Sequence, residues 1–428
     1  MRLLKNILPH TPMLNVKNKE DNLFQILFWN CLCIAFFLLS FGTNIPTPFF
    51  ILAIVFGFGN ILRSRNFRIS ENKILLFLPL YFIIMGVSLG YTDNIGVGVK
   101  LLERSLSFLF FPIIFLYTKE NSLMIKRLFI FLLIGLLVSF LVNLVIASYN
   151  SISIIDGVLS IDTSINGGYS FLDSFSHGGS YFISGEFSKL LHPSYVSVYI
   201  LVVLVYFIKN KLEKRLQILV FIFLLSYLFL LASRSAFMIL VVISIFLIFN
   251  AKNVRKKYIM VGCFIFGLLL LSSNPRISHF YSRLKGLSTM DHYKYATSEQ
   301  ARLLTWNASI KLIKSAPIIG YGVGDANDVL INKFKDLDYV YNYKKQYNSH
   351  NQFLQTFLQT GVIGFSILIV PFIYLAIRLR KNYGFLILLI LFFSLMFESM
   401  LSRFNGIVFY AIMLSLLFKK FFFNNKIL

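Results

Sequence analysis

Three side chains suited to acid–base or phosphate chemistry stand where an otherwise apolar chain meets water. Arg234 interrupts an apolar run, Arg302 lies in a long polar stretch, and His350 ends that stretch. Imidazole accepts and releases protons near neutral pH, and the guanidinium fork suits phosphate or diphosphate. A snorkelling arginine at a helix end is the plainer alternative for Arg234.

His350 is predicted to lie in the first turn of a helix. Ser349 and Gln352 have the spacing of a capping box, with Ser349 as the N-cap. The positive end of the helix dipole disfavours imidazolium there, which would leave His350 able to accept a proton. Gln352, Gln355 and Gln359 extend a polar stripe along this helix. The alternative is a histidine that serves only as a cap.

The residues around Arg302 predict an amphipathic helix that starts near Ser298 and stops at Pro317. Arg302 and Trp306 share a face, four residues apart. The positions expected to form the apolar face are Leu303, Trp306, Ile310 and Ile313. The glycine-rich segment that follows, 320–325, lacks the spacing of a nucleotide-binding loop. It predicts a turn that leads into a helix capped by Asp325.

Other ionisable residues near membrane depth are functional candidates because charge is costly there. Arg104 follows Glu103, and an ion pair between them is the alternative. Glu398 and Arg403 could likewise form a mutual salt bridge. His192 precedes Pro193 at a predicted helix start and could be an ordinary interfacial residue.

The composition indicates a polytopic helical membrane protein. The chain of 428 residues is 57% hydrophobic and 14% charged, against roughly a quarter charged in soluble domains. Apolar runs long enough to cross a bilayer recur along it. The twelve predicted spans are 23–41, 45–62, 74–91, 101–117, 127–148, 194–208, 216–232, 235–250, 258–272, 353–377, 383–397 and 404–418.

The net charge of +23 follows from topology and needs no nucleic acid. Most of the 41 Lys and Arg residues fall in every second gap between spans, as the positive-inside rule predicts when both termini are cytoplasmic. The long loops 149–193 and 273–351 then face outward, and the second is net basic, which suits an anionic ligand. The three cysteines fall within spans, so neither a disulfide framework nor a metal cluster is expected.

Three regions follow from this topology. Residues 1–272 are expected to form an N-terminal membrane domain of about nine spans, residues 273–351 a helical periplasmic loop, and residues 352–428 a C-terminal membrane segment of about three spans.

Three pieces of sequence, in order, resemble the O-antigen ligase family, which includes O-antigen polymerases and bacterial protein O-glycosyltransferases. They are Ser233-Arg234-Ser235-Ala236, then Arg302 and Trp306 with 317–322, and then 350–355 running to Gly361-Val362-Ile363-Gly364. The resemblance covers about residues 215–380. It implies a GT-C-like integral membrane glycosyltransferase of the bacterial inner membrane.

Such an enzyme moves a glycan from undecaprenyl diphosphate to an acceptor at the periplasmic face, without nucleotide sugar, metal or other cofactor. The resemblance implies that Arg234 and Arg302 bind the diphosphate and that His350 activates the acceptor hydroxyl. Substrate-binding candidates are Arg104, His192, Trp306, Asn351, Gln355, Glu398 and Arg403. Loop 149–193 contains no arginine, whereas polymerases of this kind show arginine-centred motifs in two outer loops. This favours a ligase that joins O-antigen to lipid A-core.

Two alternatives remain: an O-antigen polymerase, and a polysaccharide transporter or flippase. Twelve spans fit a transporter, although such proteins more often show two similar halves, which this chain lacks.

Overall fold

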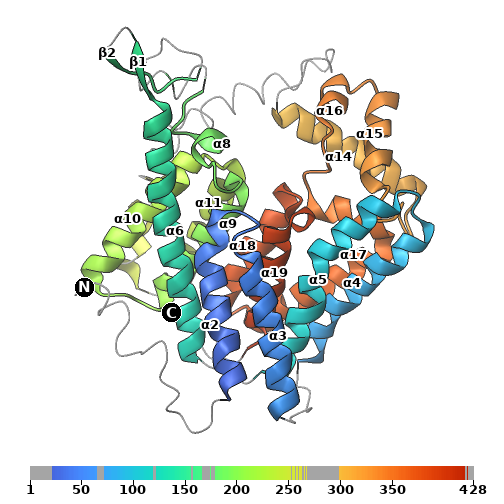
Figure 1. Cartoon of the computed structure of the whole chain (residues 1–428), viewed down its shortest axis with the longest axis horizontal. Helices are drawn as coiled ribbons and strands as arrows, with labels where there is room; N and C mark the ends of the chain where they lie inside the picture. Colours follow the sequence, from blue (N-terminus) through green and yellow to red (C-terminus); the bar gives the residue numbers. More distant parts are fainter. Residues whose placement is uncertain are drawn as a thin grey trace. The chain divides into compact units, whose positions relative to one another are not determined.

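The computed structural model describes residues 22–64, 72–118, 122–155, 158–165, 174, 179–251, scattered positions between 253 and 267, 298–419 and 422. Helices dominate these residues (Figure 1). Six helical segments are long and apolar enough to cross a membrane, and four shorter apolar helices accompany them. The expectation of an all-α membrane protein is therefore confirmed for the described residues.

Each predicted span except 258–272 coincides with a helix, and most of that span lies outside the described residues. The helix matching 101–117 starts earlier, at Ile95. Helices matching 194–208, 235–250, 383–397 and 404–418 have 14 to 17 residues, shorter than the 20 or so that span a bilayer untilted.

The chain separates into two compact units, described here one at a time. The first comprises residues 1–67, 118–278 and 427–428. Its elements are α2 (Leu23–Leu38), η1 (Leu39–Phe41), α3 (Thr47–Ser64), α6 (Ser122–Asn150), β1 (Ile152–Ile155), β2 (Val158–Ile161), α8 (Ser184–Phe187), α9 (Pro193–Lys209), α10 (Lys214–Leu231) and α11 (Arg234–Asn250).

Close backbone packing holds part of this first unit together. α2 contacts both α3 and α6, and a Cβ on Gly135 of α6 would lie 2.1 Å from the Phe37 carbonyl oxygen. β1 and β2 form an antiparallel hairpin with Ile152 opposite Ile161. The sequence did not predict this hairpin, which lies in the long loop after α6.

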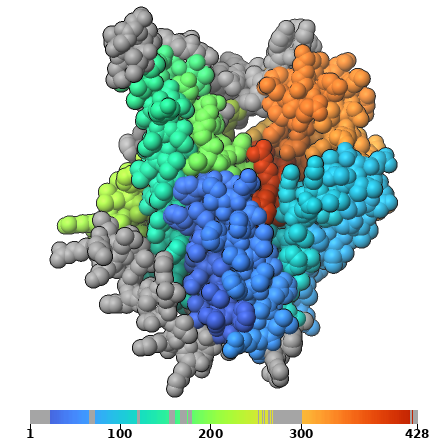
Figure 2. Space-filling view, viewed as in Figure 1, coloured from blue at the N-terminus to red at the C-terminus, as the bar shows by residue number. Residues whose placement is uncertain are grey.

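The second unit comprises residues 68–117 and 279–426. Its elements are η2 (Lys73–Leu76), α4 (Phe77–Val87), η3 (Ser88–Tyr91), α5 (Ile95–Tyr117), α14 (Ser298–Ser315), α15 (Ala326–Asp336), α16 (Val340–Lys345), α17 (Gln352–Leu379), α18 (Gly384–Phe397), η6 (Met400–Ser402) and α19 (Phe404–Leu417). α14, α15 and α16 gather beyond the ends of α4, α5 and α17 (Figure 1). In the space-filling view their orange surface borders the cyan surface of the segment that contains α5 (Figure 2).

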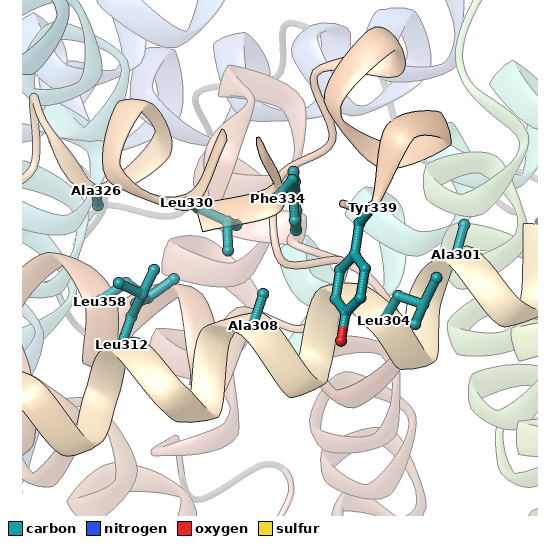
Figure 3. Packing of buried hydrophobic residues seen from close by; sticks show 9 residues of the cluster. All are labelled: Ala301, Leu304, Ala308, Leu312, Ala326, Leu330, Phe334, Tyr339 and Leu358. Carbon is teal, nitrogen blue, oxygen red and sulfur yellow. The ribbon is translucent and has the colours of Figure 1, made fainter. Parts of the chain in front are cut away.

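α14, α15 and α16 share a small hydrophobic core (Figure 3). Its members are Ala301, Leu304, Ala308 and Leu312 of α14, with Ala326, Leu330, Phe334, Tyr339 and Leu358. The apolar face predicted for α14 is therefore not the face that forms this core, although Ile313 packs against it. Leu303 and Ile310 are 40% and 46% exposed, because the helix turns Ala301, Leu304, Ala308 and Leu312 toward its neighbours. Asn342 of α16 completes the packing by donating to Ala301 O and Thr305 Oγ1, both at 2.7 Å.

α17 is interrupted at Gly361, which has φ 60° and ψ −160°. In an unbroken helix the amides of residues 362 and 363 would bond to the carbonyls of Leu358 and Gln359. Here Tyr321 N donates to Leu358 O at 2.7 Å, and Gly322 N donates to Gln359 O at 3.0 Å. Val362 N donates instead to Pro317 O at 2.9 Å. The loop after α14 thus occupies the break in α17.

The same loop is fastened to the start of α5. Asp325 stands at the N-cap position of α15, as predicted, but makes no side-chain cap bond. Its carboxylate instead accepts from Asp93 N at 2.7 Å and Asn94 N at 2.8 Å. Glycine is required alongside: a Cβ on Gly322 would lie 2.0 Å from Thr92 Oγ1, and one on Gly324 would lie 2.2 Å from Asn94 O.

Candidate active site

Glu398 joins two of the predicted catalytic residues. One carboxylate oxygen lies 2.8 Å from His350 Nδ1, and the other accepts from Arg302 Nη2 at 3.3 Å. Glu398 is nearly buried, with 11% of its side chain exposed, while the side chains of His350 and Arg302 are 22% and 36% exposed. The sequence offered Arg403 as the partner of Glu398. The structure instead pairs this carboxylate with residues 48 and 96 positions away.

His350 does not lie in the first turn of α17, so that prediction is wrong. Asn351 is the N-cap, and its Oδ1 accepts from Phe353 N and Leu354 N. His350 precedes it in the left-handed region, with φ 45°, and its amide donates to Asn348 Oδ1 at 3.0 Å. Both Ser349 and Asn351 suit an N-cap, and the spacing to Gln352 favoured the wrong one. His350 is therefore oriented by Glu398 and by a strained turn.

A buried network holds the His350 turn against the end of α18. Ser349 donates through N and Oγ to Gln355 Oε1, at 3.2 and 3.0 Å. Gln355 Nε2 donates to Asn327 Oδ1 at 3.0 Å. Ser349 Oγ also lies 3.3 Å from the hydroxyl of Ser399, the residue after Glu398. Gln355 and Asn351 therefore position the turn, although the sequence offered them as substrate contacts.

Gln352 fixes the segment that follows Glu398. It is buried, and its Oε1 accepts from Leu401 N in η6 at 2.8 Å. Ser399 and Leu401, which both follow Glu398, thus anchor the segment that presents its carboxylate to His350.

The geometry selects the tautomer of His350. A carboxylate only accepts hydrogen bonds, so the proton lies on Nδ1, between His350 and Glu398. In the neutral ring, Nε2 is then an acceptor, ready to take a proton from a hydroxyl. The bond to Arg302 balances the charge of Glu398 while engaging one terminal nitrogen of the guanidinium.

Two tyrosines extend the site on the side of Arg302. The ring of Tyr347 meets that of His350 edge to face, with centroids 5.0 Å apart, and Tyr341 lies 6.0 Å from Tyr347. Burial, together with the neighbouring Tyr341, raises the pKa of Tyr347 to about 12, while Arg302 acts in the opposite direction. The sequence did not single out either tyrosine.

The other candidates of this unit lie apart from the carboxylate. Arg104 and Glu103 are exposed on α5 and, among the described residues, form no ion pair with each other. Arg403 precedes α19 and is also exposed, without an ion pair in that part of the chain. Trp306 is half-buried one turn after Arg302, outside the core of α14 to α16.

Arg234 and His192 belong to the first unit. Arg234 is the first residue of α11, after a sharp turn in which Ala232 adopts φ 47° and Ser233 is the N-cap. His192 is the N-cap of α9, and its Nδ1 accepts from Ser194 N at 3.4 Å. The structure thus brings together Arg302, His350 and Glu398, and shows a capping role for His192.

A simple signal could have found the role of Glu398. It is the sole acidic residue after Asp338 in the whole sequence. For a histidine or arginine that packs against the C-terminal membrane segment, 352–428, Glu398 is therefore the sole side-chain carboxylate that this segment offers. Among the described residues, no group of three or more His, Cys, Asp or Glu is arranged to hold a metal ion.

Residues 219–369 match the sequence profile of a family described as O-antigen ligase, which confirms the resemblance predicted from the motifs. A comparison with curated proteins gives no match. Enzymes of this family are glycosyltransferase-like and act on lipid-linked glycans. Arg234, Arg302 and His350 lie inside the matched region, whereas Glu398 lies beyond it.

Proposed function

We propose that the chain is a membrane glycosyltransferase that moves a glycan from undecaprenyl diphosphate to an acceptor hydroxyl. The observation that carries this proposal is the Glu398 carboxylate shared by His350 and Arg302. It pairs a base with a phosphate-binding cation in one half-buried site. The match over 219–369 supports the same chemistry.

His350 is proposed as the base. Glu398 holds Nδ1–H, so Nε2 accepts the proton of the acceptor hydroxyl as its oxygen bonds to the anomeric carbon. The bond from that carbon to the diphosphate oxygen breaks, and the electron pair leaves on the diphosphate. Glu398 then stabilises the imidazolium.

Arginines are proposed to stabilise the leaving group. Arg302 keeps donors beyond the one given to Glu398, and the family resemblance assigns Arg234, at the start of α11, a role in binding diphosphate. Groups aimed at developing negative charge typically contribute about 10²–10³ in rate each. Arg104, exposed near the middle of α5, and Arg403, exposed just before α19, are proposed to attract the anionic substrates, and Trp306 to line the approach to Arg302.

An O-antigen ligase that joins O-antigen to lipid A-core is the favoured form of this activity. Loop 149–193 contains no arginine, so the second arginine-centred motif of the polymerases is missing from it. The proposed location is the bacterial inner membrane, with both termini cytoplasmic and the site at the periplasmic face.

Deletion of the gene, complemented by variants, tests the proposal. With His350→Ala or Arg302→Ala, we expect no O-antigen on lipid A-core while lipid-linked polymer persists. Arg380→Ala, an exposed arginine at the far end of α17, is the matched control and should complement fully. Single-unit chains on the core would instead indicate a polymerase. Full complementation by both site variants, at equal protein level, would exclude this catalytic assignment.

A further inference from the structure

α14 carries a second apolar face that its own core does not use. At 100° per residue, Leu303, Trp306 and Ile310 fall within a sector of about 60°, while Ile313 at its edge packs partly against that core. The core residues Ala301, Leu304, Ala308 and Leu312 occupy the opposite side (Figure 3). Leu303 and Ile310 are 40% and 46% exposed.

The exposed apolar surface continues beyond the end of α14. Ile318 and Ile319, in the loop that fills the break of α17, are 63% and 49% exposed. Pro317 O is bonded to Val362 N, and Val362 and Ile363 are themselves 43% and 42% exposed. The exposed apolar face of α14 and the loop after it form one stripe, made of Leu303, Ile310, Ile318 and Ile319. This stripe joins the exposed face of α17, a helix long and apolar enough to span a membrane.

The point at which the loop after α14 bonds to α17 sets how deep that loop lies in the bilayer. Gly361 lies nine residues after Gln352, which is roughly 14 Å along the helix axis at 1.5 Å per residue. The interfacial region of a bilayer is about 5–8 Å thick on each side. A loop bonded at Gly361 therefore reaches the acyl chains if α17 starts near the membrane surface. An apolar Ile-Ile pair suits that depth, and polar backbone is tolerated there because its bonds are satisfied by protein.

Basic residues border the stripe on its polar side. Lys314 is exposed on α14 about 20° from Leu303, and the exposed Lys311 lies farther round the same side; long cationic side chains there would reach headgroup phosphates. In Figure 1 the ribbon of α14 lies beyond the ends of α4 and α5 and slants across their direction.

We infer that α14 is an interfacial helix whose stripe of Leu303, Ile310, Ile318 and Ile319 rests in the lipid of the bilayer. The helix that carries Arg302 is thereby held at headgroup height. This inference concerns lipid contact and is independent of the reaction catalysed.

Spin-label accessibility in nanodiscs tests it. The full chain, with Cys31, Cys33 and Cys263 replaced, would be labelled at Ile310→Cys or Ile319→Cys, and at Lys344→Cys on α16 as an exposed control. We expect the ratio of oxygen to nickel-chelate accessibility to be severalfold higher at both stripe positions than at Lys344. Equal ratios would show that water covers the stripe. Low accessibility to both reagents would show that protein, such as a second copy, covers it. Either result overturns the inference.

A second measurement avoids cysteine substitution. Trp29 and Trp306 are the two tryptophans of the chain, so Trp29→Phe leaves Trp306 as the sole reporter beside the stripe. Lipids brominated near the headgroup should quench its emission severalfold more than lipids brominated at the chain end. An absence of quenching by either lipid would contradict the inference.

Discussion

His350 and Glu398 form a histidine–carboxylate pair, with 2.8 Å between Nδ1 and Oε1, across the junction of two membrane helices. Glu398 follows α18 and His350 precedes α17, so neither side chain is displayed by a regular helix. Hydrogen bonds fix the adjoining segments: His350 N donates to Asn348 Oδ1, Leu401 N donates to Gln352 Oε1, and the hydroxyls of Ser349 and Ser399 lie 3.3 Å apart. Such support makes the pair rigid, which a base needs for a defined direction of proton transfer.

Glu398→Gln should nearly abolish transfer while preserving the fold. The amide can present its NH₂ to Nδ1, which would place the ring proton on Nε2 and remove the acceptor. The analogous carboxylate-to-amide change in serine proteases costs about 10⁴-fold, and a loss of about 10²-fold or more is expected here. Transfer from a lipid-linked donor in detergent measures it. Asp336→Asn, an exposed carboxylate on α15, is the control. Activity within twofold of the parent would remove Glu398 from the mechanism.

Tyr347→Phe should leave the shape of the pH–rate profile unchanged. Burial raises the pKa of Tyr347 from 10.0 to about 12, so the phenol keeps its proton throughout the neutral and mildly alkaline range. Any stabilisation linked to this proton is present below pH 10 and is lost only as the pH rises toward 12. A limb of the profile below pH 10 therefore belongs to another group. If that limb disappears in the phenylalanine variant, Tyr347 is itself the titrating residue.

Asp325→Ala should loosen α14, α15 and α16 from the start of α5. The change removes two charge-assisted bonds, to Asp93 N and Asn94 N, each typically contributing about 1.5–3 kcal/mol. Limited proteolysis should then cut the segment 298–345 faster than in the parent. Asp336→Ala loses only an exposed pair with Lys333 at 3.9 Å, worth about 0–1 kcal/mol. Equal cleavage rates in the two variants would argue against the role of Asp325.

Gly361→Ala should lower thermal stability by more than a helix-propensity change would explain. A Cβ there would lie 2.1 Å from Ile318 O, at a φ of 60°, and left-handed strain alone costs about 1–3 kcal/mol. Gly86→Ala in α4 has no atom within 4 Å, so it should be neutral or stabilising by up to about 1 kcal/mol. A thermal midpoint in the Gly361 variant that matches this control would mean that the break is adaptable.

The sequence predicted the membrane helices well because long apolar runs leave few alternatives in lipid. It predicted α14 itself but not the face that packs, because Ala301, Leu304, Ala308 and Leu312 also recur at helical spacing and only tertiary contacts distinguish the two faces. It failed on the cap of α17 because Ser349 and Asn351 both satisfy local rules. The choice between them depends on Gln355 and Ser399.

Arg302 and His350 could be nominated from residue type and position, but their shared partner could not. The pairing of Glu398 with residues 48 and 96 positions away arises from the tertiary arrangement of α14, α17 and α18. Local spacing favoured Arg403, five residues on, and carried no information about those contacts.

The break in α17 also bears on the order of assembly. The carbonyls of Leu358 and Gln359 accept from Tyr321 N and Gly322 N, and unpaired carbonyls cost several kcal/mol in lipid. The segment 317–322 precedes α17 along the chain, so it has already left the ribosome when α17 emerges. The partners that fill the break are therefore already synthesised when α17 forms, so the break can be closed as soon as α17 folds.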